Sequence, residues 1–450
     1  MQLNFDKRFL PMICVLRDFK KQVAGEKSKT FKICVERNNG YNCQYSLDIF
    51  DSEDLDKKRQ NYLIVERIIK TILWIAGGYK IYLCGDKSIY SAIKADYSPT
   101  GARNFDVDFM QGVYEMPFEV IETKNEDFPR LKESSLSIGG HLNGERIGLD
   151  VGGSDIKISA VKNGKVVYSE EIIWNPKQQS NYEYHYQTIK NAIKKCADKL
   201  DNACALGVST AGVCINNRVM VSALFIKVPK QDFNRYLKDI YINIAKELNL
   251  PVEVANDGDV TALAGAMEFG DNCVLGIALG TSEAGGYINE NGGLNGWISE
   301  LAFVPLDFDK NACRDEWSGD CGCGVKYLSQ DGVIKLAILA GIEFEDGLTP
   351  AEKLKKVQSL LMGGDKRVIC VYEDIGAYLG YAIAYYAQFY KIKKVQVLGR
   401  VVSGLGGEII VNKARQIISK EFGEYAQIVI ELPEESSRRV GQSVAAASLK

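Results

Sequence analysis

Residues 146–157, RIGLDVGGSDIK, guide the interpretation of this 450-residue chain. An apolar run ends at Asp150, two glycines and a serine follow, and a second run begins at Ile156. This order predicts a buried strand, a tight turn and another strand. Glycines in such a turn let backbone N–H groups approach an anion, and a carboxylate at a strand end can hold a hydrated Mg²⁺. Taken alone, the motif also fits an ordinary acidic β-turn.

A second turn of the same build lies at 280–282, Gly-Thr-Ser, again between two apolar runs. Two such turns favour two halves of similar topology, each binding one side of a polyphosphate. Two unrelated hairpins are the alternative.

A polar pair, Asn256 and Asp257, stands where the predicted strand 251–256 meets the predicted helix 260–270. Open α/β sheets form their sites at the carboxyl ends of strands. Asp257 is therefore a candidate general base for a substrate hydroxyl, and Asn256 a candidate hydroxyl-binding amide. The alternative is that Asp257 or Asp259 only caps the helix.

A fourth glycine-rich turn, with Gly404, Gly406 and Gly407, follows a short predicted strand and precedes a helix. Glycines here would let a nucleotide base or ribose lie flat against the backbone. By itself the turn is equally typical of an ordinary strand–helix connection.

The composition excludes several classes of protein. Hydrophobic residues make up 46%, charged residues 25%, and the formal net charge is −3, as in soluble globular proteins and unlike disordered chains or strongly basic nucleic-acid binders. No apolar run reaches the ~18–20 residues of a membrane span, and charges interrupt every apolar stretch of the N-terminus. We expect a cytoplasmic protein without a membrane partner.

Cysteine and histidine usage narrows the chemistry. The 12 cysteines are scattered over a long chain, which argues against a secreted disulfide scaffold. The only two histidines, His141 and His185, nearly exclude a histidine-based mechanism. Nucleic-acid binding is not expected either, because residues 1–145 carry as many acidic as basic residues.

The chain changes character once, in the polar stretch 122–145, which is predicted to be a linker. Before it, a hairpin around Asn38-Asn39-Gly40, a helix over 61–78 and a strand over 80–85 predict a small α+β domain, 1–121, of unknown role. After it, strands and helices alternate, which predicts an α/β architecture.

In this order, the four turns resemble the sugar-kinase/actin/Hsp70 superfamily and, within it, the ROK family (repressors, open reading frames, kinases). The resemblance covers residues 146–450. It implies a two-lobed actin-like ATPase fold with ribonuclease H-like halves. The first lobe would span 146–260 and the second 261–433, with a C-terminal helix, 434–450, packing back on the first.

The resemblance also implies a site for ATP, Mg²⁺ and a sugar. The nucleotide would be bound by Asp150, Gly152, Gly153, Ser154, Lys157, Gly280, Thr281, Ser282, Gly404, Gly406 and Gly407. Asp150 would organise the Mg²⁺, and Asp257 would deprotonate the sugar hydroxyl. The sugar itself would be contacted by Asn256, Asp257, Glu300 and Gln330.

The chain departs from the family pattern at two places. Phe303 stands where the family has a histidine that contacts both sugar and zinc. In the family's zinc box only Cys321 and Cys323 remain; Leu328 takes the place of the third cysteine, and Gln330 that of a glutamate. Structural zinc needs four ligands, so zinc is not expected. Cys313 and Asp320 are the alternative further ligands.

These observations predict an ATP-dependent carbohydrate kinase with an alcohol acceptor, acting on a sugar or sugar derivative other than plain glucose. One alternative is a catalytically weak or inactive sugar- or nucleotide-binding sensor of the same fold. Another is a transferase of the superfamily with a non-sugar acceptor. Whether the protein forms a homodimer is left open.

Overall fold

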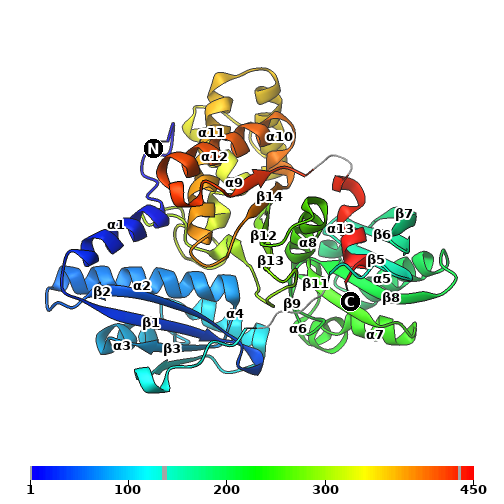
Figure 1. The fold of residues 1–450 in the computed structure, drawn as a ribbon. Helices are drawn as coiled ribbons and strands as arrows, with labels where there is room; N and C mark the ends of the chain where they lie inside the picture. The colour runs from blue at the N-terminus through cyan, green and yellow to red at the C-terminus, as the bar shows by residue number, and fades with distance from the viewer. Residues whose placement is uncertain (1–2, 134–138, 434–436, 450) are drawn as a thin grey trace. The chain divides into compact units, whose positions relative to one another are not determined.

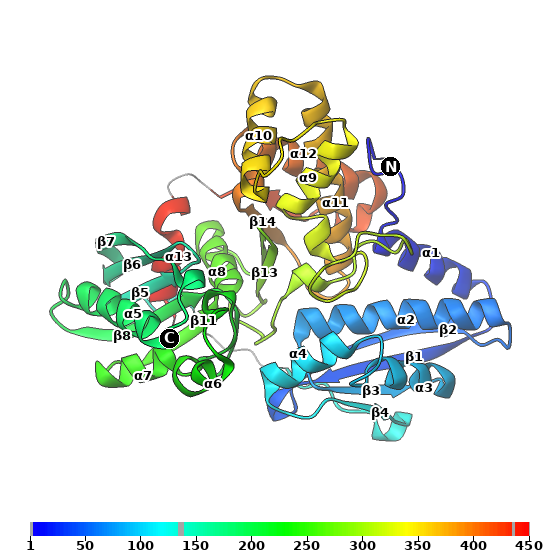
Figure 2. The same ribbon diagram turned by 180° about the vertical axis from the view of Figure 1, so that it is seen from behind.

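The computed structural model describes residues 3–133, 139–433 and 437–449, and Figures 1 and 2 show it from opposite sides. The chain divides into two compact units. The Asp150 unit contains Ser134–Gly276, Gly286–Ile298 and Pro433–Lys450, and the Glu300 unit contains Met1–Glu133, Ile277–Gly285 and Ser299–Leu432. The lobe boundaries expected from the sequence stay predictions.

The N-terminal region, residues 3–133, forms a four-stranded sheet in the order β2-β1-β3-β4. Its elements are α1 (Met12–Ala24), β1 (Ser28–Glu36), β2 (Asn42–Phe50), α2 (Leu55–Ala76), β3 (Lys80–Cys84), α3 (Lys87–Asp96), α4 (Asn104–Tyr114) and β4 (Glu119–Glu122). The predicted hairpin, helix and strand are all present. Asn39 and Gly40 turn the hairpin with φ of 63° and 71°, a backbone region that asparagine and glycine tolerate.

The long helix α2 (Leu55–Ala76) has a clear signal at each end. The Asp54 side chain accepts hydrogen bonds from the N–H groups of Asp56 and Lys57, and Gly77 ends the helix with a φ of 76°. The predicted linker 122–145 holds a short 3₁₀ turn, Asn125–Asp127, and its residues 134–138 lie outside the described part of the chain.

The Asp150 unit is built on a five-stranded sheet in the order β11-β8-β5-β6-β7. Its strands are β5 (Glu145–Val151), β6 (Asp155–Lys162), β7 (Lys165–Ile173), β8 (Ala203–Thr210) and β11 (Val252–Asn256), with a small pair of β9 (Val213–Ile215) and β10 (Arg218–Val221) beside them. β5, β8 and β11 run parallel, whereas β6 and β7 are antiparallel to their neighbours. The carboxyl ends of three parallel strands therefore meet at one edge of the sheet.

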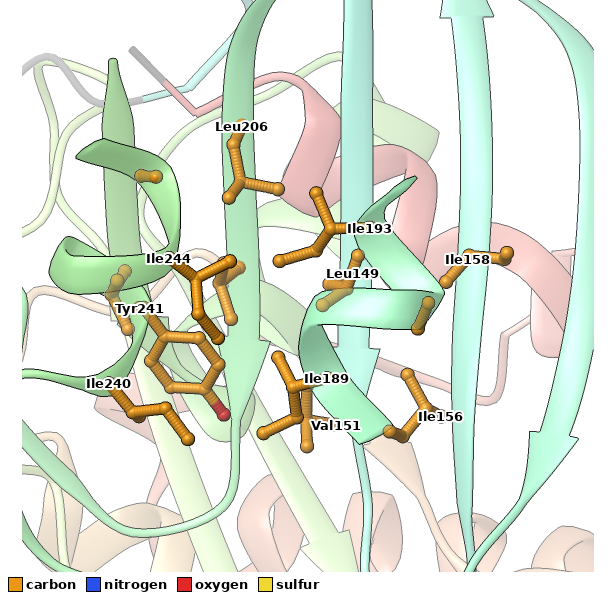
Figure 3. Close-up of a cluster of buried hydrophobic side chains, with 14 of the residues drawn as sticks. Leu149, Val151, Ile156, Ile158, Ile189, Ile193, Leu206, Ile240, Tyr241 and Ile244 are labelled. Carbon is orange, nitrogen blue, oxygen red and sulfur yellow. The ribbon is translucent and has the colours of Figure 1, made fainter. Parts of the chain in front are cut away.

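Helices cover this sheet on both faces. These helices are α5 (Tyr182–Ala197), α7 (Ile240–Glu247), α8 (Asp257–Phe269) and α13 (Ser437–Ala447), and the unit also contains the short α6 (Lys230–Asp232). In Figure 3, side chains of α5 and α7 form one core with Leu149 and Leu206 of the strands. Successive strand residues point to opposite faces, so Gly148 and Gly207 lie on the other face, where α13 packs.

The approach of α13 to the sheet is close enough to require glycine. A Cβ on Gly207 would lie 1.7 Å from the Ala446 carbonyl oxygen, and one on Gly148 would lie 1.8 Å from that of Ser443. The predicted C-terminal helix is thus seated on the strand that carries Asp150. Residues 434–436 and 450 of that prediction lie outside the described residues.

A second sheet has the order β13-β12-β14-β15, and the Glu300 unit contains β14, β15, the end of β12 and the beginning of β13. Its elements are β12 (Val274–Leu279), β13 (Glu283–Ile288), α9 (Gln330–Leu339), α10 (Pro350–Met362), α11 (Lys366–Tyr386), β14 (Lys394–Leu398), α12 (Leu405–Glu421) and β15 (Val429–Glu431). The first residues of the chain join this unit: Met12 N–H donates to the Leu306 carbonyl at 2.9 Å, and Asp6 pairs with Lys335 at 2.9 Å. Within the described residues, no helix is both long and apolar enough to cross a membrane.

Candidate functional site

Asp150 lies near the carboxyl end of β5 and is buried. Its Oδ1 accepts a hydrogen bond of 2.8 Å from the Ser209 hydroxyl on β8, and Lys157 Nζ on β6 lies 4.0 Å from its Oδ2. Burial raises the pKa of Asp150, while Ser209 and Lys157 act in the opposite direction. A desolvated carboxylate with one cationic neighbour suits a hydrated divalent cation.

The turn after Asp150 is held by its own backbone and by a buried tryptophan. Gly152 N–H donates to the Asp155 carbonyl at 3.0 Å, and Trp174 Nε1–H donates to the Gly152 carbonyl at 2.9 Å. The Ser154 carbonyl accepts the Trp174 backbone N–H at 3.1 Å. The space beside Gly153 is open except for the Lys177 side chain, whose Nζ would lie 3.7 Å from an added Cβ. This exposed turn with a nearby cation can receive an anion.

Asn256 and Asp257 occupy the junction of β11 and α8. Asn256 caps the helix, since its Oδ1 accepts from Gly258 N–H at 2.7 Å and its Nδ2 donates to the Gly212 carbonyl at 2.7 Å. The alternative in which Asp257 or Asp259 is the cap is therefore wrong. Asp257 is the first residue of the helix; its Oδ1 accepts a longer hydrogen bond of 3.0 Å from the same Gly258 N–H, but the carboxylate is not the cap.

Asp257 and Asp259 are half-buried carboxyls whose pKa values lie far from normal. Burial and the neighbouring charge of Asp150 raise the pKa of Asp257 to about 7. Burial, and to a smaller extent Asp257, raise the pKa of Asp259 to about 7 as well. A carboxyl that titrates near neutral pH is suited to general acid–base chemistry.

In the Glu300 unit, three segments meet around the turn at Gly280. Gly280 N–H donates to the Ser282 carbonyl at 3.0 Å, and the Gly280 carbonyl accepts the backbone N–H of Gln330 at 2.8 Å. A Cβ on Gly399, just after β14, would lie 2.3 Å from the Leu279 carbonyl oxygen. The structure thus brings Gln330, which is buried at the start of α9, to the predicted phosphate turn.

The residue that follows this turn, Glu283, is a buried acid that the sequence reading did not single out. Its Oε1 accepts a hydrogen bond of 2.8 Å from Tyr386, and its Oε2 has no hydrogen-bond partner among the described residues. Burial raises its pKa to about 8, which favours the protonated form of this carboxyl. Gly324 packs directly on it, because a Cβ there would lie 2.2 Å from Oε2.

The glycines of the fourth turn have packing reasons of their own. Gly404 precedes α12 in open space with a φ of 67°. A Cβ on Gly406 would lie 2.4 Å from the Tyr372 ring, and one on Gly407 would lie 2.3 Å from the Val402 carbonyl oxygen. Contact of these glycines with a nucleotide stays a prediction.

Glu300 does not lie with Gln330 in the contacts described above; it lies against the N-terminal region. Its backbone N–H donates to the Trp74 carbonyl at 2.9 Å, and the side chain is half-buried. The Phe303 ring packs on Trp74 with 4.2 Å between ring centroids. An aromatic neighbourhood therefore surrounds the position that the family pattern gives to histidine.

The cysteine-containing loop lacks the ligands of a zinc site. Leu328 is fully buried in the place of a third thiolate, and Cys313 is exposed. Asp320, the other alternative ligand, is engaged in ion pairs with basic residues of the N-terminal region. Throughout the described ranges, no group of three or more His, Cys, Asp or Glu residues is placed to hold a metal. The residues present do not fit zinc.

Three residues that contact the candidate site were not predicted from the sequence: Ser209, which donates to Asp150, Trp174, which supports the first turn, and Glu283, which follows the second. Ser209 could have been found, because it ends an apolar strand that must pair beside Asp150. Trp174 and Glu283 act through contacts between segments that no local pattern joins.

Comparisons with known proteins find a family model and relatives that match most of this chain. Residues 146–445 match the model of the ROK family. A glucokinase of Halalkalibacterium halodurans is 26% identical over 300 residues, which cover 62% of this chain and 86% of that protein.

Solved structures show the same fold at low sequence identity. A ROK hexokinase from Thermus thermophilus matches with a TM-score of 0.54 and 17% identity, over 67% of this chain and 96% of that one. A ROK glucokinase from Streptomyces griseus, solved with glucose and AMPPNP, matches with a TM-score of 0.51 and 21% identity, over 68% of this chain and 98% of that one. A ROK transcriptional regulator, a homologue of the E. coli MLC protein, matches with a TM-score of 0.55 and 18% identity, over 68% of this chain and 78% of that one. The predicted actin-like fold class is confirmed.

Proposed function

Because the chain belongs to the ROK family, we propose that it is an ATP-dependent kinase that phosphorylates a hydroxyl of a sugar or sugar derivative. The observation that carries the proposal is Asp257, a carboxyl with a pKa raised to about 7, standing next to a helix cap that is already occupied by Asn256. The glucokinase relative supports the reaction class.

In the proposed reaction, Asp257 acts as the general base. It accepts the proton of the sugar hydroxyl while the hydroxyl oxygen forms its bond to the γ-phosphorus and ADP leaves. The reaction thus needs Asp257 deprotonated at the outset, which its pKa near 7 permits at neutral pH. Loss of such a base lowers turnover by roughly 10²–10⁴-fold.

Asp150 and the glycine turns serve the nucleotide in this proposal. Asp150 would hold a Mg²⁺ ion, which would neutralise phosphate charge. The charge of Asp150 raises the pKa of Asp257, and a bound cation would offset that charge. Gly152, Gly153, Ser154 and Lys157 would contact phosphates. Gly280, Thr281 and Ser282 would also contact phosphates, and Gly404, Gly406 and Gly407 would border the nucleoside.

The sugar would be recognised by Asn256, Glu300 and Gln330. Phe303, with its ring against Trp74, offers no hydrogen bond, and a sugar hydroxyl buried beside it would lose ~1–3 kcal/mol. We therefore expect glucose to bind one to two orders of magnitude more weakly than in a family member with histidine at that position, and the substrate to be a derivative with an apolar group there.

A catalytically weak sugar sensor is the second candidate. Phe303 and Gln330 favour it, because both depart from the family pattern at positions expected to contact the sugar, whereas Asp150 and Asp257 are retained.

The test is ADP release with ATP and Mg²⁺ across glucose, other hexoses and N-acetylhexosamines, with melting temperatures measured alongside. Sugar-stimulated ADP release that is lost in Asp257→Asn supports the kinase. Stabilisation by a sugar or by ATP without turnover identifies the sensor instead.

A further inference from the structure

The last turn of α2 binds the loop that carries Glu300. The final carbonyls of a helix have no partner within the helix. In α2, Gly77 N–H donates to the Leu73 carbonyl. The next two carbonyls bind the loop instead: the Trp74 carbonyl accepts Glu300 N–H and the Ile75 carbonyl accepts Ser299 N–H, each at 2.9 Å. Two consecutive backbone amides of the loop are therefore fixed by the N-terminal region.

The loop needs this support, because Ser299 has a φ of 47°, a left-handed conformation that a serine adopts at a cost. The Ser299 hydroxyl also lies 3.2 Å from Tyr390 Oη, which donates to it. Strained backbone persists where the surrounding contacts over-determine it. Here these contacts come from the end of α2 and from Tyr390, which follows α11.

Aromatic packing continues the contact beyond Glu300. The Phe303 ring lies 4.2 Å from Trp74, 5.7 Å from Phe105 and 6.4 Å from Phe109, measured between ring centroids. The Trp74 ring is itself fixed by a hydrogen bond of 2.9 Å from its Nε1–H to Asp106. The segment 299–303 is thus attached to α2 and α4 through both backbone and side chains.

The far end of the same loop is attached through charge. Asp320 pairs with Arg67, Lys70 and Arg103, at 2.9 Å in each case. Glu66 and Asp106 complete the cluster, with Glu66 2.7 Å from Arg67 Nε and Asp106 3.5 Å from Lys70 Nζ. We call these six residues the Asp320 cluster.

The Asp320 cluster is neutral as a whole, with three acids and three bases, and almost completely buried. Burial opposes its charges, but Lys70 and Arg67 still hold the pKa of Asp320 below its ordinary value. Removing one partner from a buried ion pair leaves an uncompensated charge, which is strongly unfavourable. The three ion pairs of Asp320 therefore hold this end of the loop against α2 and the residue before α4.

We propose that the N-terminal region is a positioning element for sugar binding: α2 holds the backbone at Glu300, and the Asp320 cluster anchors the loop that follows. Arg67, Lys70, Trp74 and Arg103 are positioning residues in this proposal and touch no substrate. The sugar-binding part rests on the proposed function, whereas the attachment of the loop does not.

The experiment compares Asp320→Asn with Asp6→Asn in the full-length chain. Asp6 is the matched control, because it also joins the N-terminal residues to the rest of the unit, accepting from Tyr378 at 2.6 Å and pairing with Lys335 at 2.9 Å. Arg103→Gln is the milder second variant, in case Asp320→Asn does not fold. Amide hydrogen exchange over residues 299–303 is measured together with KM for ATP, glucose and N-acetylglucosamine.

We expect exchange at Ser299 and Glu300 to become about tenfold faster in Asp320→Asn, in keeping with the weakening of a hydrogen bond, and to stay unchanged in Asp6→Asn. KM for the sugar should rise about tenfold, with KM for ATP within about twofold of wild type. Unchanged exchange in both cluster variants overturns the proposal. Faster exchange with an unchanged sugar KM overturns its sugar-binding part. If the wild-type protein neither binds nor phosphorylates a sugar, the proposed function fails, and the exchange data alone decide the attachment.

Discussion

Replacing Asp257 with asparagine should stabilise the Asp150 unit at pH 8 while it removes the proposed catalytic base. The pKa of Asp257 rises from its ordinary 3.8 to about 7 on folding, because burial and the charge of Asp150 disfavour the carboxylate. Asparagine keeps an acceptor for Gly258 N–H, which lies 3.0 Å from Asp257 Oδ1, and carries no charge. The substitution therefore removes a cost and retains the local hydrogen bond.

The size of this effect follows from the pKa change. One pKa unit corresponds to ~1.36 kcal/mol, so a rise from 3.8 to about 7 corresponds to about 4 kcal/mol. Asp257 is only half-buried, and solvent screening reduces this to about 2 kcal/mol.

The sign of the pH dependence is fixed. Because its pKa is raised on folding, Asp257 does not reduce the free energy of unfolding below about pH 3.8, and it reduces that free energy progressively as the pH rises through about 7. The gain in free energy of unfolding from asparagine should therefore be less than half as large at pH 5 as at pH 8.

Urea unfolding of the wild type and of Asp257→Asn at pH 5 and pH 8 measures this gain. Glu145→Gln on β5 is the control, because the Asn202 backbone N–H and Lys162 lower the pKa of Glu145 and give its variant the opposite sign, a loss at pH 8 that shrinks at lower pH. A loss of stability in Asp257→Asn at pH 8, or an equal change at both pH values, would refute the conclusion that burial and Asp150 raise the pKa of Asp257.

Three further predictions concern packing, a buried acid and metals. Gly207→Ala should lower the free energy of unfolding in urea by at least about 3 kcal/mol, because the added Cβ would collide with Ala446. The control Gly112→Ala, in open space on α4, should change it by less than about 1 kcal/mol. Equal effects of the two substitutions would contradict the packing of α13. Glu283→Gln should flatten the fall in stability between pH 4.5 and about 8 that burial of this acid causes, and an unaltered pH profile would show that Glu283 is not the buried acid responsible. Chelators should leave the melting temperature unchanged, and about one equivalent of zinc in the purified protein would contradict this.

Local patterns were sufficient to predict much of the framework. The hairpin around Asn39, the helix ending at Gly77 and the strand ending near Asp150 each carry a short-range signal, either alternation of apolar residues or a glycine with positive φ. The turns at 152–154 and 280–282 could be located for the same reason. Their roles came from the resemblance to a family, not from the turns themselves.

Long-range contacts could not be predicted in this way. Arg67 and Asp320 are far apart in the sequence, and neither lies in a motif that marks a buried ion pair. That the Asn256 side-chain oxygen caps α8 was not predicted either, because the free N–H groups at a helix start bind the nearest acceptor whatever its other role, and contact of Asn256 with a hydroxyl stays a prediction. Glu283 stands in an apolar strand pattern, and its burial depends on Tyr386 and on Gly324.

The most direct test of the central claim is product formation by the wild type and by Asp257→Asn, measured as sugar phosphate made from ATP, Mg²⁺ and the best acceptor of the sugar panel. The account predicts a sugar phosphate with the wild type, and a rate ~10²–10⁴-fold lower with Asp257→Asn at an unchanged KM for ATP. Equal rates in the two proteins, or no sugar phosphate from the wild type with any acceptor, would contradict it.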